Sequence, residues 1–193
     1  MSLGFLFDTP EFKEVLESVR RGDKGVRIAG VPDAAMPYLL AGLVLKLGKR
    51  LVCVRPPSRA LSPLEEECRF FLGQLRSTIP TGVLPALSDD PYLEIPPSLE
   101  AVSSRMRFLY DVRSGRPSLV LTNPFGLLKP LPCPEDLERS FLKLEVGEKA
   151  DRDILLRTFA EYGYSREDII ASPGEYAWRG GIVDVFPPWQ EHP

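Results

Sequence analysis

One continuously apolar run limits the folds open to this chain more than any other feature. Residues 118–123 read Ser-Leu-Val-Leu-Thr-Asn, and a run without polar alternation is typical of a strand buried on both faces of a parallel sheet. Other short apolar segments alternate with stretches of helical spacing, which favours an α/β fold. The predicted strands are 26–30, 51–54, 83–87 and 118–123, and the predicted helices are 8–19, 37–47, 62–72 and one that opens at Pro97.

A proline-rich break at 129–134 precedes a change of pattern. Residues 141–146 alternate like a strand with one exposed face, 151–162 have helical spacing, and 182–186 suit a strand that ends at Pro187-Pro188. A strand, a helix and a ribbon make an incomplete module, because more strands are usually needed for stability. We therefore expect an α/β domain at 1–140 and a partial small α+β domain at 141–193.

The stretch 174–187, Gly-Glu-Tyr-Ala-Trp-Arg-Gly-Gly-Ile-Val-Asp-Val-Phe-Pro, carries the main candidate site. The pair Gly180-Gly181 predicts a bulge, a bend or a close approach of two backbones. Arg179 precedes this pair, and its planar guanidinium is suited to gripping a carboxylate or phosphate of a partner. The alternative is an edge hairpin with a solvated arginine that does nothing specific.

Gly30 opens a stretch with the layout of a phosphate loop, namely a strand, a glycine and the start of a helix. When the pattern G-x-x-x-x-G-K-[ST] is laid on Gly30, Ala35 replaces the second glycine, Met36 the lysine and Pro37 the metal-binding hydroxyl. A phosphate could still reach the helix N-terminus, but the residues that support ATP hydrolysis are missing. The alternative is an ordinary connection between a strand and a helix.

Composition excludes several classes of function. His192 is the only histidine, which argues against Ser/His/Asp and Cys/His catalysis and against metal sites that need two imidazoles. We therefore assign no catalytic residue and no metal ligand. The 24 Lys and Arg residues against 27 Asp and Glu give a net charge of −3, which is not the footprint of a protein that wraps nucleic acid.

Two further observations indicate the cellular compartment. Three widely spaced cysteines, Cys53, Cys68 and Cys133, argue against a disulfide framework and favour a reducing, cytoplasmic setting. The longest apolar run is interrupted by Gly42, Lys46 and Gly48, so no membrane span is expected.

The order of these segments resembles a known family. Five segments follow one another along the chain in this order: the stretch after Gly30, Ser103-Ser104-Arg105, the strand at 119–122, Glu161-Tyr162-Gly163-Tyr164 and the stretch 174–187. This order is similar to the N-terminal UvrB-like region of bacterial transcription-repair coupling factors (the Mfd family), over nearly the whole chain. The resemblance implies a helicase-like α/β domain with a degenerate P-loop, followed by the start of a small domain that docks onto UvrA.

The resemblance also implies which residues bind the partner. In this family the arginine of the Arg-Gly step contacts UvrA, and the matching residues here are Arg179 and Gly180, with Glu175 in the same motif. Further contacts are expected beyond Pro187, so we predict weak or lost UvrA binding by this chain. RNA polymerase, DNA, ATP and Mg²⁺ are expected only at other domains of the parent protein, an ATP-driven DNA translocase.

Three functions therefore remain in competition. The leading hypothesis is a non-catalytic module that recruits UvrA to stalled RNA polymerase in transcription-coupled nucleotide excision repair, without a cofactor of its own. The second is a nucleotide-binding α/β enzyme with an unusual loop at Gly30. The third is a DNA-binding helicase fragment, such as a UvrB N-terminal region, in which Arg105 and Arg107 would form a basic patch rather than a solvated helix face.

Overall fold

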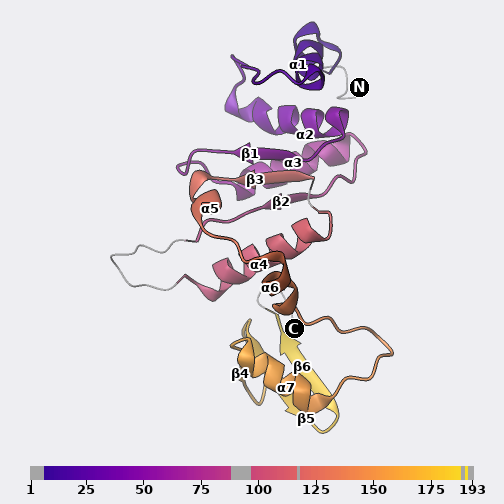
Figure 1. The fold of residues 1–193 in the computed structure, drawn as a ribbon, viewed down its shortest axis with the longest axis vertical. Helices are drawn as coiled ribbons and strands as arrows, with labels where there is room; N and C mark the ends of the chain where they lie inside the picture. Colours follow the sequence, from indigo (N-terminus) through magenta and orange to yellow (C-terminus); the bar gives the residue numbers. More distant parts are fainter. Residues whose placement is uncertain (1–6, 88–96, 117, 188–189, 191–193) are drawn as a thin grey trace. The chain divides into compact units, whose positions relative to one another are not determined.

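A computed structural model describes residues 7–87, 97–116, 118–187 and 190. Pro188 and His192 lie outside the described residues. The chain divides into two compact units, Met1–Ala86 with Asp111–Leu128, and Leu87–Tyr110 with Lys129–Pro193. Each unit is described by itself (Figure 1), and the division into domains at 1–140 and 141–193 stays a prediction.

The first unit is built on a parallel sheet of three strands, in the order β1-β3-β2. The strands are β1 (Leu51–Val54), β2 (Thr81–Val83) and β3 (Leu119–Thr122). In β3 every residue is buried, which confirms the prediction of a central strand at 118–123. Strand β2 begins two residues earlier than predicted and ends at Val83, although the Leu84 N–H still donates to the Leu121 carbonyl at 2.9 Å.

The other elements of the first unit are helices, and α4 has most of its residues in the second unit. The Thr9 hydroxyl accepts a hydrogen bond from the Phe12 N–H at 3.4 Å, and Gly22 ends α1 in the left-handed conformation. No side-chain cap starts α3, because Leu61 takes the N-cap position and Ser62 is already helical. The bounds are α1 (Pro10–Arg21), the short 3₁₀ helix η2 (Asp33–Ala35), α2 (Met36–Leu47), α3 (Ser62–Gln74), α4 (Leu99–Arg113) and α5 (Pro124–Leu128).

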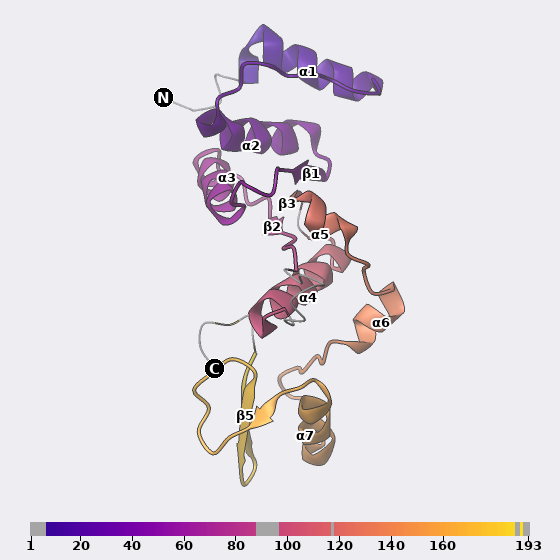
Figure 2. The same cartoon turned by 90° about the vertical axis from the view of Figure 1, so that its left-hand side faces the viewer.

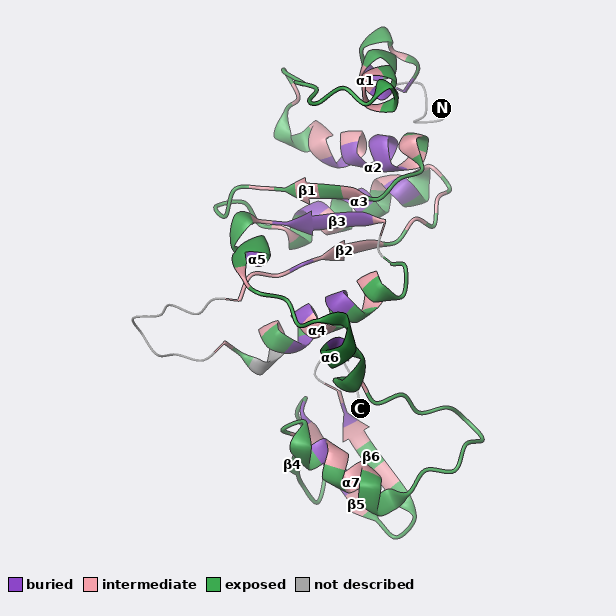
Figure 3. Ribbon diagram, in the orientation of Figure 1, coloured by how far each residue is buried: buried purple, intermediate pink, exposed green. Residues whose placement is uncertain are grey.

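The core of the first unit joins helices α2 and α3 to strand β3. Figure 3 shows β3 and one side of α2 as buried. Cys68 is fully buried in this cluster, and burial raises the pKa of its thiol to about 12, so the group acts as a small apolar residue. All three cysteines are free. The cluster consists of Leu40, Ala41, Val44, Leu64, Cys68, Leu72, Leu119 and Leu121.

The predicted strand at 26–30 is wrong. This segment is extended and exposed, with Val26 and Ile28 about two-fifths accessible to solvent. A strand needs a hydrogen-bonded neighbour, and among the described residues β1 pairs with β3 and not with this segment. The apolar composition of 26–30 therefore did not suffice to form a strand.

The second unit carries a small mixed sheet and a helix on one of its faces. Its sheet has the order β4-β5-β6, with β4 (Ser165–Arg166) parallel to β5 (Glu175–Arg179) and β5 antiparallel to β6 (Ile182–Phe186). Helix α7 (Arg152–Glu161) is capped by Asp151, whose Oδ1 accepts from the N–H groups of Asp153 and Ile154. Phe159 of α7 contacts the rings of Tyr164 and Tyr176, with centroids 5.6 and 5.4 Å away, and Figure 2 shows α7 beside β5.

The predicted strand at 141–146 is also wrong. Phe141 follows the short helix α6 (Pro134–Arg139), and its ring lies 4.6 Å from that of Tyr110. Leu144 and Val146 are exposed. The segment borders a hollow of about 650 Å³ instead of pairing with a strand, so its alternating apolar side chains contact helices and solvent.

Among the described residues, no helix is long and apolar enough to cross a membrane.

We expect Gly126→Ala to destabilise the protein by about 1–3 kcal/mol. A Cβ on Gly126 would lie 3.1 Å from the Leu84 carbonyl and closer still to Oγ1 of Thr122. This hydroxyl is buried and donates to the same carbonyl at 3.0 Å. Gly73→Ala is the matched control, because nothing lies within 4 Å of a Cβ at this helical site. Urea unfolding should show the control unchanged or stabilised, and equal stability of both variants would contradict this packing.

Candidate functional site

The candidate site is the turn that joins β5 to β6. Arg179 pairs with Ile182 across the hairpin, so Gly180 and Gly181 form a two-residue turn. Only Gly180 has a positive φ, of 58°, which matches a type II′ turn. Nothing lies within 4 Å of a Cβ added at either glycine. The glycine pair is therefore a tight turn that the backbone conformation requires, and not a close approach of two backbones.

Arg179 is exposed at the end of β5 but is held in place. Its Nη2 donates to the main-chain carbonyl of Asp168 at 2.6 Å. Among the described residues, no other hydrogen bond or ion pair of this side chain is found. A guanidinium has several further N–H donors in one plane. Arg179 is thus fixed at one edge while other donors stay available to a partner.

Glu175 has a task within its own loop. Its Oε2 accepts from the N–H groups of Ala171 and Ser172, at 2.7 and 2.8 Å. These bonds lower the pKa of the Glu175 carboxyl below its ordinary value. The carboxylate closes the loop 171–175, and direct contact of Glu175 or Gly180 with a partner stays a prediction.

Trp178 and two arginines were not recognised from the sequence. The Arg166 guanidinium lies over the Trp178 ring with Cζ 4.2 Å from the centroid, and Arg152 lies near the same ring at 5.4 Å. Period-two alternation could have placed Trp178 on the face of Tyr176. The two arginines come from β4 and from the start of α7, and no local spacing indicates that they meet.

The stretch after Gly30 has ion pairs at the place where a phosphate loop would hold its ligand. Asp33 Oδ2 lies 2.6 Å from Arg59 Nη1, and Asp33 Oδ1 lies 3.7 Å from Arg55 Nη2. Gly30 has a positive φ of 77°. A carboxylate of the chain itself therefore engages two arginines, Arg55 and Arg59.

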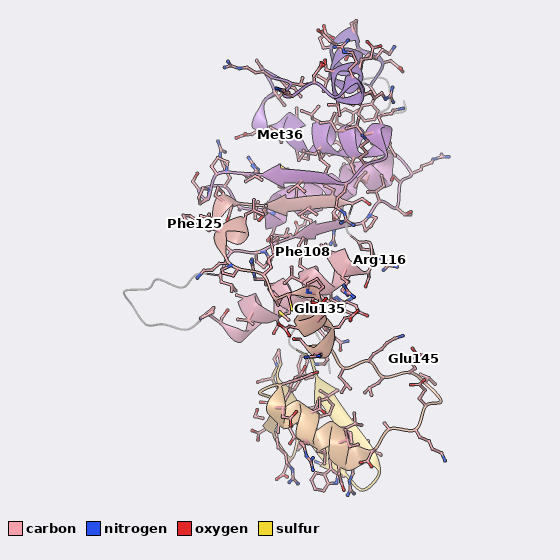
Figure 4. The ribbon with its side chains drawn as sticks, in the orientation of Figure 1. Met36, Phe108, Arg116, Phe125, Glu135 and Glu145 are labelled. Carbon is pink, nitrogen blue, oxygen red and sulfur yellow. The ribbon has the colours of Figure 1, made fainter. Side chains whose placement is uncertain are left out.

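The other residues of this stretch belong to helix α2. Ala35 is its N-cap, Met36 its first residue, which packs against the core, and Pro37 is buried in its first turn. Figure 4 labels Met36 at the start of this helix. The three residues therefore start and anchor α2, and none of them provides a charged donor for a phosphate.

The basic patch considered for Arg105 and Arg107 does not form as expected. Arg105 is 4% exposed, its Nη2 donates to the Lys129 carbonyl at 3.4 Å, and burial lowers the pKa of its guanidinium. Only Arg107 is exposed. Arg105 is therefore a packing residue, and it belongs neither to a basic patch nor to a solvated helix face.

We expect Glu175→Gln to loosen the loop 171–175. The folded-state pKa of Glu175 is depressed, so its stabilising effect is present above the unfolded pKa and is lost as pH falls through the folded pKa. In NMR pH titrations of the intact chain, the amide signals of Ala171 and Ser172 should shift with a midpoint pH below the ordinary pKa of glutamate. Glu161→Gln, an exposed control on α7, should leave this midpoint unchanged. A midpoint at or above the ordinary value would contradict the assignment.

Comparison with known proteins identifies the region. Residues 142–193 match the family described as the UvrB interaction domain. The chain is 32% identical over 186 residues to the transcription-repair-coupling factor of Myxococcus xanthus, an alignment covering 94% of this chain and 15% of that protein. It is 28% identical over 191 residues to the transcription-repair-coupling factor of Mycobacterium tuberculosis, covering 95% and 15%.

Proteins named UvrABC system protein B are also similar. The one from Chlorobium limicola is 24% identical over 194 residues, covering 95% of this chain and 28% of that protein. The chain thus spans 15% of the length of the two coupling factors and 28% of the length of the Chlorobium limicola protein. These matches confirm the resemblance on which the sequence interpretation depended. The chain is similar to a region shared by transcription-repair-coupling factors and UvrB proteins, and its residues 142–193 match the UvrB interaction domain family.

Proposed function

We propose that this chain is a non-catalytic docking module that binds UvrA through the β5–β6 hairpin, with Arg179 as its anchor. The observation that carries the proposal is the position of Arg179 within a UvrB interaction domain, exposed beside the hairpin turn and tied to the Asp168 carbonyl. Gly180 supports this role because the turn needs its positive φ. Glu175 supports it by closing the loop that follows Asp168.

The hydrogen bond to the Asp168 carbonyl makes Arg179 a better anchor than a free surface arginine. Immobilising a long side chain on binding costs conformational entropy, and a side chain that is already held loses less of it. The remaining planar donors can grip a carboxylate in a bidentate manner. The hydrogen bond to Asp168 therefore favours the binding function over the idle, solvated arginine.

The biological setting follows from the named relatives. Transcription-repair-coupling factors are similar to this chain over almost its whole length. We assign to the chain the recruitment of UvrA to stalled RNA polymerase in transcription-coupled nucleotide excision repair. Contacts with RNA polymerase and DNA, and the use of ATP and Mg²⁺, are assigned to other regions of such longer relatives.

The first unit is assigned as a helicase-like α/β domain whose phosphate loop is degenerate and binds no cofactor. A parallel sheet and the turn at Gly30 support this assignment. The ion pairs of Asp33 with Arg55 and Arg59 argue against a bound triphosphate, because the carboxylate would repel it. Met36, in the position of the lysine, packs against the core and offers no charge.

We expect Arg179→Ala to weaken UvrA binding about tenfold or more, as truncation of a central arginine often does. The intact chain should bind weakly, with a Kd above about 1 µM. Line broadening in NMR spectra of the labelled chain during titration with UvrA measures such weak binding. Arg157→Ala is the control, since Arg157 is exposed on α7 and has no ring contact or hydrogen bond among the described residues.

Two outcomes would contradict this proposal. One is a chain that shows no UvrA-dependent broadening at any accessible concentration. The other is an Arg179→Ala variant that binds as well as the intact chain. Equal losses in the Arg179→Ala and Arg157→Ala variants would point to general electrostatic attraction and would also count against an anchor at Arg179.

We expect no ATP binding in calorimetry, with or without Mg²⁺, because lysine and hydroxyl are missing from the loop. Asp33→Ala removes the carboxylate that pairs with Arg55 and Arg59. This variant should also fail to bind ATP, since the freed arginines do not replace the missing loop groups. An ATP Kd better than about 1 µM, worth roughly 8 kcal/mol, would favour a nucleotide-binding enzyme instead.

A further inference from the structure

Positive charge gathers in the first unit where helices α1 and α2 end. Arg20 Nη2 donates to the main-chain carbonyl of Lys46 at 3.3 Å, so the last turns of the two helices lie side by side. Figures 1 and 2 both show α1 next to α2. Gly22 and Gly48 end these helices in the left-handed conformation, and the loops that follow add further cations. We call this surface the basic corner; it consists of the exposed residues Arg20, Arg21, Lys24, Lys46, Lys49 and Arg50.

Few carboxylates of the chain offset the charge of the basic corner. Residues 20–50 contain seven Lys and Arg but only two Asp. Asp23 pairs with Arg21 at 3.1 Å, whereas Asp33 pairs with two arginines outside the corner. In the described part of the chain, no ion pair or side-chain hydrogen bond is found for Lys24, Lys49 and Arg50.

The helix dipoles explain only part of this charge. Cations in the last turn of a helix offset the negative end of its macrodipole, which accounts for the three basic residues in the last turns of α1 and α2. The three basic residues in the loops lie beyond the caps, where this effect has fallen off. Glu17 lies one turn before Arg21, but no ion pair joins them in the described part of the chain. The loop cations therefore remain available to an external anion.

We propose that the basic corner is a docking surface for an acidic segment of a partner protein. The corner belongs to the first unit, so this contact is separate from the UvrA docking proposed for the β5–β6 hairpin and does not rest on it. A single exposed ion pair contributes little. A cluster of cations with one sign can attract a segment of opposite charge and select its orientation.

Two apolar side chains beside the basic corner suit a protein partner. Val26 and Ile28 follow Lys24 on the extended segment, and each is about two-fifths accessible to solvent. A segment that carries both acidic and apolar residues can contact these side chains as well as the cations. A phosphate backbone would use the cations alone, so the mixed surface favours a protein segment.

Duplex nucleic acid is the less favoured occupant. Domains that bind nucleic acid usually carry a strong excess of basic residues, whereas this chain has a net charge of −3. Since residues 20–50 are basic, the rest of the chain is net negative and would repel a long polyanion. A short acidic segment need not extend beyond the corner.

The test is an NMR titration of the labelled 193-residue chain with a short synthetic peptide of alternating Glu and Leu. Amide signals at 20–27 and 46–50 should shift, and the affinity should fall as salt is added, because salt screens exposed charges. The double variant Lys49→Glu with Arg50→Glu should bind about fivefold more weakly or worse, since two attractions become repulsions. The matched control reverses two exposed cations of the second unit, Lys149→Glu with Arg157→Glu, and should bind like the intact chain.

Three results would overturn the inference and leave the UvrA docking proposal standing. The first is an intact chain that does not bind the acidic peptide. The second is an equal loss in both double variants, which would show that net charge alone is responsible. The third is duplex DNA that binds more tightly than the peptide and loses affinity in the Lys49→Glu, Arg50→Glu variant, because the occupant would then be nucleic acid. If thermal unfolding shows that this variant is misfolded, Lys24→Glu in the other loop decides, with an expected loss of about twofold or more.

Discussion

The buried central strand β3 is the constraint on which the first unit depends. Its flanking strands β1 and β2 pair with it and not with each other, so hydrogen bonding of both edges requires the backbone of β3. Thr122 at its end is fully buried, and its hydroxyl donates to the Leu84 carbonyl at 3.0 Å, which satisfies a polar group that burial would otherwise penalise. The same hydroxyl leaves no room for a side chain at Gly126. One strand therefore fixes the sheet order, a polar contact and the start of α5.

The elements that could be predicted from the sequence are those whose residue pattern has a local physical cause. The run at 118–123 is apolar because β3 is buried, and the helix predicted at 8–19 forms as α1, whose caps at Thr9 and Gly22 are local interactions. The segments 26–30 and 141–146 have equally good strand patterns, yet neither pairs. Pairing depends on which edge lies nearby in space, and a single sequence holds no such information. Alternation alone therefore overpredicts strands wherever apolar residues pack against helices or solvent.

The candidate site shows the same division between local and distant causes. Arg179 and the glycine turn were found because the turn chemistry is local. Glu175 was selected as a partner contact, but its carboxylate holds the amides of Ala171 and Ser172, a local bond that residue type alone does not reveal. The stacking of Arg166 on Trp178 joins two strands whose loop length gives no register. It became visible only when the parallel β4–β5 pair was known.

An arginine that is restrained before binding makes a different binding surface from one that moves freely. A single exposed ion pair contributes little, because water screens it and the side chain loses freedom. Here the Arg179 guanidinium is already restrained by the Asp168 carbonyl. It therefore loses less entropy on binding. Its remaining planar donors can meet a carboxylate in only a few orientations, and this geometric demand would give the contact its selectivity even if its affinity were low.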